Sequence, residues 1–319
     1  MAEAIPDAPP RTPAQQALDA HLLQSKNNRR GIILALCAMA LFVCNDSLVK
    51  LATSSFSTGQ VLVIRGLFAT SIMLTVVLVS KQGKSLRFMF TRLLMVRATA
   101  ESMVALCFVT SISQLALADL TAILQATPLI ITLFSVVLGI EKIGWRRWSA
   151  VIVGFVGVLL VVKPGGHTFN IYALLALLSC FLVAFRDLMT RKINPAIPTV
   201  VVSLTTTLSV VVVGLLLGLE SWKPIELQPT LYLLAAAMFV SAGNMSIVKA
   251  YRIADPSAVS PFRYSVVIWA FLSGFVVFGE IPDALAIIGT GLIVASGIYT
   301  VHRERVRARE LTTEANLSV

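Results

Sequence analysis

The chain has 319 residues, of which 57% are hydrophobic and 13% are charged, and its formal net charge is +10. Soluble domains carry about twice that share of charged residues, so the composition excludes a water-soluble globule. In a soluble chain the positive charge would favour a nucleic-acid partner. Here the basic residues lie in short patches between long apolar runs. That pattern is typical of a protein that crosses a lipid bilayer several times, and we expect no nucleic-acid partner.

The first segment, residues 1–29, is polar and is predicted to be a disordered cytoplasmic tail. After it, apolar runs long enough for a helix to cross a ~30 Å hydrocarbon core follow one another at short intervals. No soluble parallel sheet repeats this length so often, so helices are favoured over strands. The predicted fold class is an all-α polytopic membrane protein. Its ten transmembrane helices are expected at residues 31–51, 60–80, 95–114, 118–140, 148–163, 171–190, 198–219, 230–249, 256–278 and 282–301.

Basic residues are distributed unequally between the two sides of this predicted map. Of the 26 Lys and Arg residues, 19 fall on one side, whereas the loops of the opposite side hold only Lys163 and Lys223. By the positive-inside rule both termini are cytoplasmic, including the C-terminal tail at residues 303–319, and the number of spans is even. We expect a multi-pass protein of a bacterial inner membrane.

The chain also repeats itself. Asp46 and Lys50 recur as Asp187 and Arg191, with the same four-residue spacing and an offset of 141 residues. Two further matches follow in the same order: Ala-Asp at 118–119 and 254–255, and an apolar residue with Gly-Glu near 138–141 and at 278–280. Two halves of five helices each are therefore predicted at residues 30–165 and 170–302. An odd number of helices forces the second half to enter the membrane from the opposite side, which is the arrangement of alternating-access carriers.

The most specific stretch lies at the end of the first half: Ala-Asp-Leu-Thr-Ala-Ile-Leu-Gln-Ala-Thr-Pro at 118–128, Leu-Gly-Ile-Glu at 138–141, Gly-Trp-Arg-Arg-Trp at 144–148 and Lys-Pro at 163–164. It resembles the EamA-type branch of the drug/metabolite transporter superfamily, and the resemblance covers about residues 30–302. It implies two EamA-like repeats and a small-molecule substrate, with amino-acid exporters and vitamin or nucleoside importers among its members. Residues 45–50 and 60–65 are most similar to a subgroup that includes RibN-type riboflavin importers.

Ionisable groups inside spans cost about 2.5–3.5 kcal/mol each at the bilayer centre, so each needs a partner or a function. Arg97 and Glu101 lie four residues apart on one helix face and could neutralise each other. Asp46 with Lys50, and Asp187 with the cation four residues later, are either local ion pairs or gates on alternate faces.

Arg65 has no acidic residue on its own helix face, so we expect it to reach Asp46, water or a substrate. Arg263 follows Pro261, and proline-broken helices at matching places in two halves indicate a binding site. The corresponding region of the first half contains Gln125 and a proline at 128. The predicted substrate-binding or gating residues are Asp46, Lys50, Arg65, Arg97, Glu101, Gln125, Asp187, Asn244, Arg263 and Tyr264.

Neither a metal nor a cofactor is expected, because the four cysteines show no metal-ligand spacing and the three histidines lie outside the apolar runs. No catalytic or ATP-binding motif is present, which disfavours a membrane enzyme and leaves a gradient or exchange as the driving force. We predict a secondary carrier for a small organic metabolite, with riboflavin uptake first and export of amino acids or related metabolites as the alternative. The sequence leaves the coupling ion open, and also the choice between a monomer and a homodimer.

Overall fold

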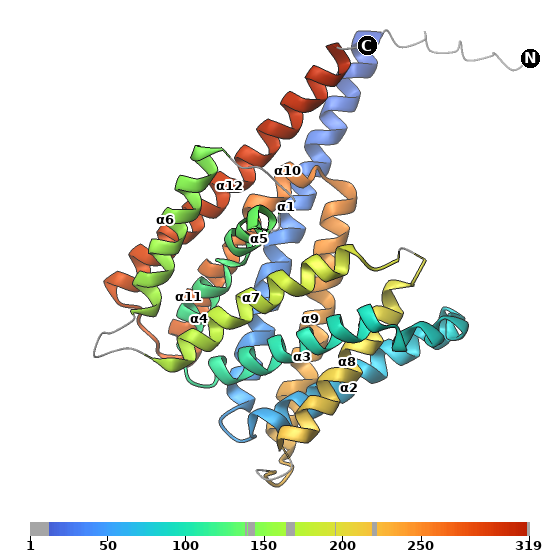
Figure 1. Cartoon of the computed structure of the whole chain (residues 1–319), viewed down its shortest axis with the longest axis vertical. Helices are drawn as coiled ribbons and strands as arrows, with labels where there is room; N and C mark the ends of the chain where they lie inside the picture. Colours follow the sequence, from blue (N-terminus) through green and yellow to red (C-terminus); the bar gives the residue numbers. More distant parts are fainter. Residues whose placement is uncertain are drawn as a thin grey trace, which may run out of the picture.

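The computed structural model describes residues 13–137, 139, 144–163, 170–194, 196–218 and 222–317. Within these residues every regular element is a helix, and Figure 1 shows the helices crossing one another in one bundle. The helices are α1 (Pro13–Ala52), α2 (Thr58–Val79), η1 (Gly83–Phe90), α3 (Arg92–Ile112), α4 (Leu117–Leu124), α5 (Thr127–Val137), α6 (Trp145–Val162), α7 (Ile171–Arg191), α8 (Thr199–Gly218), α9 (Leu227–Ile253), α10 (Pro256–Val259), η3 (Ser260–Tyr264), α11 (Ser265–Phe278) and α12 (Ala284–Leu317).

Eight segments of the described chain are long and apolar enough to cross a membrane. The prediction of an all-α membrane protein with several spans is confirmed. Two further apolar helices, Trp148–Val162 and Ala284–Thr300, are shorter, and the count of ten spans, which includes both, stays a prediction.

The start of α1 corrects the sequence analysis. Residues 13–29, which were expected to be part of a disordered tail, form the first turns of α1, and residues 1–12 lie outside the described residues. An apolar span marks only the part of a helix that lies in lipid. Once that span has nucleated the helix, a polar segment rich in Ala, Gln and Leu extends it at little cost. In Figure 1 the start of α1 and the end of α12 both project beyond the bundle.

Two predicted spans are interrupted at the places that the prolines indicated. The span at 118–140 is divided into α4 and α5, with Gln125 and Ala126 between them, and the span at 256–278 is divided into α10, η3 and α11. Pro128 and Pro261 each lie at the second position of the segment that follows the break, where a missing backbone N–H removes no helical hydrogen bond. The matched breaks are confirmed.

Helices of the first half pack mainly against helices of the second half. The closest pairs are α1 with α9, α3 with α7, α2 with α8, and α6 with α12. If α1, α2, α3 and α6 correspond in order to α7, α8, α9 and α12, exchanging the halves converts the first pair into the second and leaves the other two unchanged. The pairing pattern therefore has the form of a two-fold relation between the halves.

Glycines allow the two self-corresponding pairs to approach closely. A Cβ atom added at Gly59 of α2 would lie 2.6 Å from the Cα of Gly218 in α8. In the other pair, a Cβ at Gly157 of α6 would lie 2.6 Å from the carbonyl oxygen of Gly289 in α12, and the reverse contact is the same. Helices in lipid are not driven together by the hydrophobic effect. Small residues at such crossings stabilise the contact instead, because they allow the two backbones to pack closely.

Gly157→Ala is expected to lower the free energy of unfolding by about 1–3 kcal/mol, because the added methyl group overlaps the α12 backbone and forces the helices apart. The measurement is thermal or denaturant unfolding in detergent. Gly291→Ala in α12 is the matched control: nothing lies within 4 Å of its Cβ position, and alanine favours helix by about 0.5–1 kcal/mol. Equal effects of the two substitutions would contradict the packing argument.

Candidate functional site

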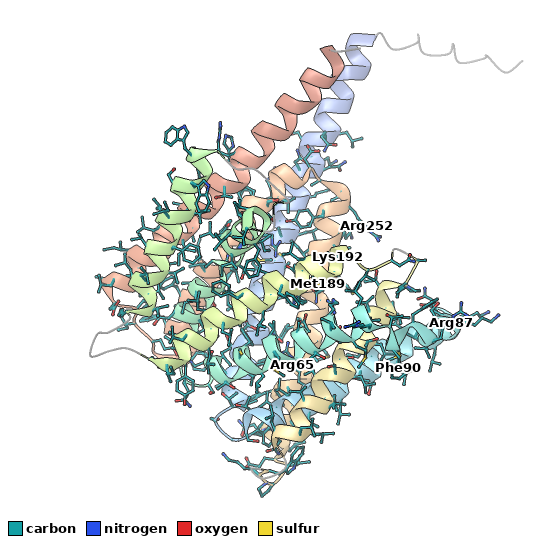
Figure 2. The ribbon with its side chains drawn as sticks, in the orientation of Figure 1. Arg65, Arg87, Phe90, Met189, Lys192 and Arg252 are labelled. Atoms are coloured by element: carbon teal, nitrogen blue, oxygen red, sulfur yellow. The ribbon has the colours of Figure 1, made fainter. Side chains whose placement is uncertain are left out.

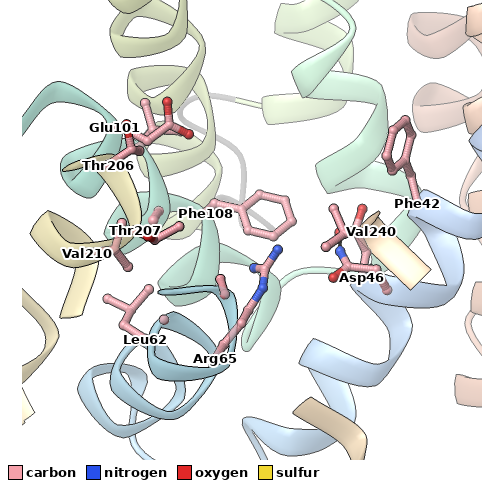
Figure 3. A pocket seen from close by; sticks show the side chains of 15 residues that line it. Phe42, Asp46, Leu62, Arg65, Glu101, Phe108, Thr206, Thr207, Val210 and Val240 are labelled. Carbon is pink, nitrogen blue, oxygen red and sulfur yellow. Dashed lines mark hydrogen bonds between the residues drawn. The ribbon is translucent and has the colours of Figure 1, made fainter. Parts of the chain in front are cut away.

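A cavity of about 460 Å³ lies between α1, α2, α3, α8 and α9, and Figure 3 shows it from close by. Its lining is mostly apolar, with Phe42 and Phe108 as the aromatic side chains. Three charged side chains interrupt this lining: Asp46 from α1, Arg65 from α2 and Glu101 from α3. An apolar chamber with a few convergent polar groups is the usual form of a small-molecule site, and its volume lies within the range of such sites.

Two more cavities adjoin this first cavity. The second, of about 520 Å³, shares Arg65 and Glu101 with it and is also lined by Arg97, Asp187 and Asn244. The third, of about 510 Å³, is lined by the following predicted residues: Gln125, Asp187, Arg263 and Tyr264. It shares Phe42 with the first cavity. Nine of the ten predicted site residues therefore line adjoining cavities, and Lys50 does not.

Most of the charged groups around these cavities satisfy one another across α3 and α7. Arg186 donates from Nη1 to Oε2 of Glu101 at 2.7 Å, and from Nε and Nη2 to Oδ1 of Asp187 at 2.9 and 2.8 Å. Arg97 lies with its Nη2 3.9 Å from the same Glu101 oxygen and donates to Thr190 and Thr206. The predicted Arg97–Glu101 pair is therefore present, but Arg186 of another helix makes the shorter contact.

Asp46 and Arg65 have no ion-pair partner among the residues that the structure describes. The Asp46 carboxylate accepts one hydrogen bond, at 2.7 Å, from the side-chain amide of its neighbour Asn45. Within the described part of the chain, Arg65 forms neither a hydrogen bond nor an ion pair. Of the three alternatives expected for it, the contact with Asp46 is therefore not made, and water or a substrate remains. In Figure 3 the Arg65 guanidinium points into the cavity beside the Phe108 ring, toward the side that carries Asp46. Two opposite charges thus face the same chamber with free hydrogen-bonding capacity.

The expectation of a local Asp46–Lys50 pair is wrong. Lys50 instead forms an ion pair with Glu280, which follows α11, and also donates to the Leu115 carbonyl at 2.6 Å. Glu280 in turn accepts from the backbone N–H of Leu117 at 2.8 Å. We call the Lys50–Glu280 contact the α1-end ion pair. It joins the end of α1 to α11 and to the turn before α4, away from the cavity.

The corresponding local pair in the second half stays a prediction, because the Arg191 side chain lies outside the described residues. Asp187 itself accepts hydrogen bonds from Arg186. Two side chains four residues apart on a helix can form an ion pair. The spacing does not determine whether they bind each other or residues on a neighbouring helix. Lys50 binds a residue from another part of the chain, whereas Asp187 binds its neighbour on α7.

The remaining predicted residues lie around the second and third cavities. Arg263 is exposed in the third cavity and has no ion-pair partner among the described residues, and Gln125 borders the same space. The Tyr264 hydroxyl is directed against α12, since a Cβ at Gly297 would lie 2.0 Å from it. Tyr264 therefore contributes mainly its ring to the cavity wall. Asn244 is exposed at the edge of the second cavity.

Several residues of these contacts were not among the predicted site residues. Asn45 positions Asp46, Arg186 binds both acids of the second cavity, and Glu280 completes the α1-end ion pair. The repeated Gly-Glu pattern was a signal for Glu280 that the prediction used only as evidence of duplication. Thr206 and Thr207 also line the first cavity, and polar residues within the apolar run of α8 were a further signal.

The sequence matches the model of the EamA-like transporter family twice, over residues 29–163 and 170–301. It is 30% identical to the riboflavin transporter of Vibrio cholerae over 59% of this chain and 63% of that protein. It is 27% identical to the S-adenosylmethionine uptake transporter of Rickettsia bellii over 55% of this chain and 62% of that protein. These two matches thus span less than two thirds of those relatives.

A longer match, over 85% of this chain and 95% of the relative, is to the pseudopaline exporter CntI of Pseudomonas aeruginosa, at 25% identity. A solved crystal structure aligns over 86% of this chain and 98% of its own, with a TM-score of 0.56 and 18% identity. That similarity extends to the fold alone.

Removing one member of the α1-end ion pair should cost stability. Glu280→Ala leaves the Lys50 ammonium with the Leu115 carbonyl but without a counter-charge, and it leaves the Leu117 N–H without its acceptor. We expect the free energy of unfolding to fall by about 2–4 kcal/mol, somewhat less than for a fully buried pair. The double variant Lys50→Ala/Glu280→Ala should lose less than the sum of the single losses.

The matched control is the Lys163–Asp283 pair nearby, in which Asp283 is 54% exposed. Lys163 donates a hydrogen bond to Asp283 and holds the pKa of that carboxyl below its usual range. Lys163→Ala leaves the hydrogen bond from the Ala286 N–H to Asp283 in place and should cost under about 1 kcal/mol, because water screens the ion pair. Strict additivity of the Lys50 and Glu280 losses would show that the two side chains do not interact.

Proposed function

Because the chain belongs to the EamA-like transporter family, we propose that it is a secondary carrier that moves a small organic metabolite across the bacterial inner membrane by alternating access. Family membership confirms the resemblance to the drug/metabolite transporter superfamily, and it confirms a transporter rather than an enzyme. The matches to bacterial transporters support the choice of membrane.

The pairing of the helices supports two inverted five-helix repeats within ten spans. The two family matches divide the chain at residues 164–169, and the closest helix pairs are preserved when the halves are exchanged. Related halves that face each other around a chamber can rock between two arrangements with opposite openings. In this proposal the α1-end ion pair closes the outer side, since it lies at the end of α1 opposite to the cytoplasmic N-terminus.

The proposed substrate is inferred from the lining of the first cavity. This cavity lies where both halves meet, its lining includes two aromatic rings, and it presents one anion and one cation that have no ion-pair partner among the described residues. A planar, neutral molecule with a polar edge fits this combination, because its ring can pack against Phe42 or Phe108 while its edge meets Asp46 and Arg65. We therefore place riboflavin first, in the direction of uptake. The similarity to a riboflavin transporter supports this choice.

One observation favours a second candidate. Opposite charges that face one chamber also suit a zwitterion, whose ammonium would bind Asp46 and whose carboxylate would bind Arg65 in a bidentate manner. Export of amino acids or related metabolites is therefore the alternative, and the similarity to a pseudopaline exporter over 85% of the chain supports it.

The test is uptake of labelled riboflavin in a bacterial strain that can neither make nor import it. The wild-type chain should restore growth on low riboflavin and give saturable uptake. Arg65→Ala should reduce uptake at least about tenfold, because a charge-assisted hydrogen bond is lost, and Arg65→Lys should fall between. Lys223→Ala, which changes an exposed cation outside the cavities, is the matched control.

Absence of growth with verified membrane expression would remove riboflavin and put amino-acid export first. Unchanged uptake in Arg65→Ala would remove Arg65 from the site while leaving the substrate in place.

The orientation has its own test. Figure 2 shows Arg87, Lys192 and Arg252, from three predicted cytoplasmic segments, toward one side of the bundle, with Arg65 among the helices. In a variant that lacks the four native cysteines, Lys84→Cys in η1 should resist a membrane-impermeant thiol reagent in intact cells, and Glu226→Cys before α9 should react. The opposite pattern would reverse the proposed topology.

A further inference from the structure

The unpaired groups of the first cavity define a hydrogen-bonding pattern, and the pattern can be matched to a ligand edge. Glu101 is excluded from this pattern because Arg186 and Arg97 already surround its carboxylate. Asp46 and Arg65 remain, one an acceptor and the other a donor of several hydrogen bonds.

Asn45 holds Asp46 in a defined position. The Asn45 side chain is 3% exposed, and its amide nitrogen donates to Oδ1 of Asp46 at 2.7 Å. No second hydrogen bond reaches the Asp46 carboxylate among the described residues, so its other oxygen is free to accept from a ligand. A carboxylate fixed on one side and free on the other is suited to accept a single N–H.

From this geometry we infer that the first cavity recognises a planar heterocycle by a cyclic imide edge, with Asp46 accepting the imide N–H and Arg65 donating to a flanking carbonyl. The inference rests on the proposed riboflavin carrier and specifies which edge of the flavin is bound. The pyrimidine ring of the flavin carries such an edge, with the N3–H between two carbonyl groups. The Phe108 ring lies beside the Arg65 guanidinium and gives the flavin a face to pack on.

We assign the second cavity to the part of riboflavin that lies outside the flavin ring. It adjoins the first along Arg65 and Glu101, and its walls carry hydroxyl and amide groups from α7, α8 and α9: Thr190, Ser203, Thr206, Thr207, Ser241 and Asn244. A polyhydroxylated side chain finds donors and acceptors there that an apolar cavity lacks. The ring is therefore placed in the first cavity and the ribityl chain in the second.

The test compares uptake of riboflavin with uptake of 3-methylriboflavin, in which the imide N–H is replaced by N–CH₃. The wild-type chain should prefer riboflavin by about 10- to 100-fold, since the methyl group removes a hydrogen bond to a charged acceptor and leaves that acceptor unpaired. In Asp46→Ala the preference should fall to about one, and in Asp46→Asn, which keeps a neutral acceptor of similar size, it should be intermediate.

Asp283→Ala, which removes an exposed carboxylate outside the cavities, should keep the wild-type preference. Quenching of flavin fluorescence by the purified protein provides the same ratio for binding alone, so a variant that binds but does not transport still gives a result. If the wild-type chain transports both flavins equally, or if Asp46→Ala keeps the preference, the imide assignment is overturned while the riboflavin carrier stands. If no flavin is bound or transported, the proposed function falls and the assignment falls with it.

Discussion

A charge inside an apolar helix bundle must be matched by an opposite charge, by hydrogen bonds or by a ligand, and this constraint organises the structure. Arg186 meets the constraint by binding Glu101 of α3 and its own neighbour Asp187. Lys50 meets it at the end of α1 through Glu280. Among the described residues, Asp46 and Arg65 have no ion-pair partner and face the cavity between the halves, and Arg263 has none in the third cavity. In the proposed carrier, the unmatched charges would mark the position where a ligand completes the structure.

Two kinds of contact hold the halves together, and they differ in what they permit. The glycine crossings of α2 with α8 and of α6 with α12 bring backbones into direct contact, which leaves little room for change in their spacing. The ion pairs and hydrogen bonds of α1, α3 and α7 join polar groups that water or a ligand can replace. In the proposed alternating-access carrier, the halves would rock about the close crossings while the polar contacts are exchanged.

The sequence was sufficient for whatever depends on local pattern. Apolar length predicted the helices, and the prolines at 128 and 261 predicted the two breaks, because both follow from the backbone of one segment. It was insufficient wherever a side chain chooses between helices. Lys50 lies four residues from Asp46 but binds Glu280, and Glu101 is closer to Arg186 than to Arg97. The prediction of a disordered tail was wrong at residues 13–29 for a related reason. Hydropathy locates the part of α1 that lies in lipid, but it does not locate the residue at which the helix begins.

The placement of α1 connects the candidate site with the closure of one face. Asp46 and Lys50 lie one turn apart on this helix, so the group that faces the cavity and the group that binds Glu280 belong to the same rigid element. Ser47, between them, shares a hydrogen bond of 2.6 Å with Ser273 of α11. A movement of α1 that parts Lys50 from Glu280 must therefore also displace Asp46 relative to Arg65 on α2. In the proposed carrier, a ligand held by Asp46 and Arg65 would have different contact energies in the two arrangements, and that difference would allow substrate binding to shift the population of open and closed states.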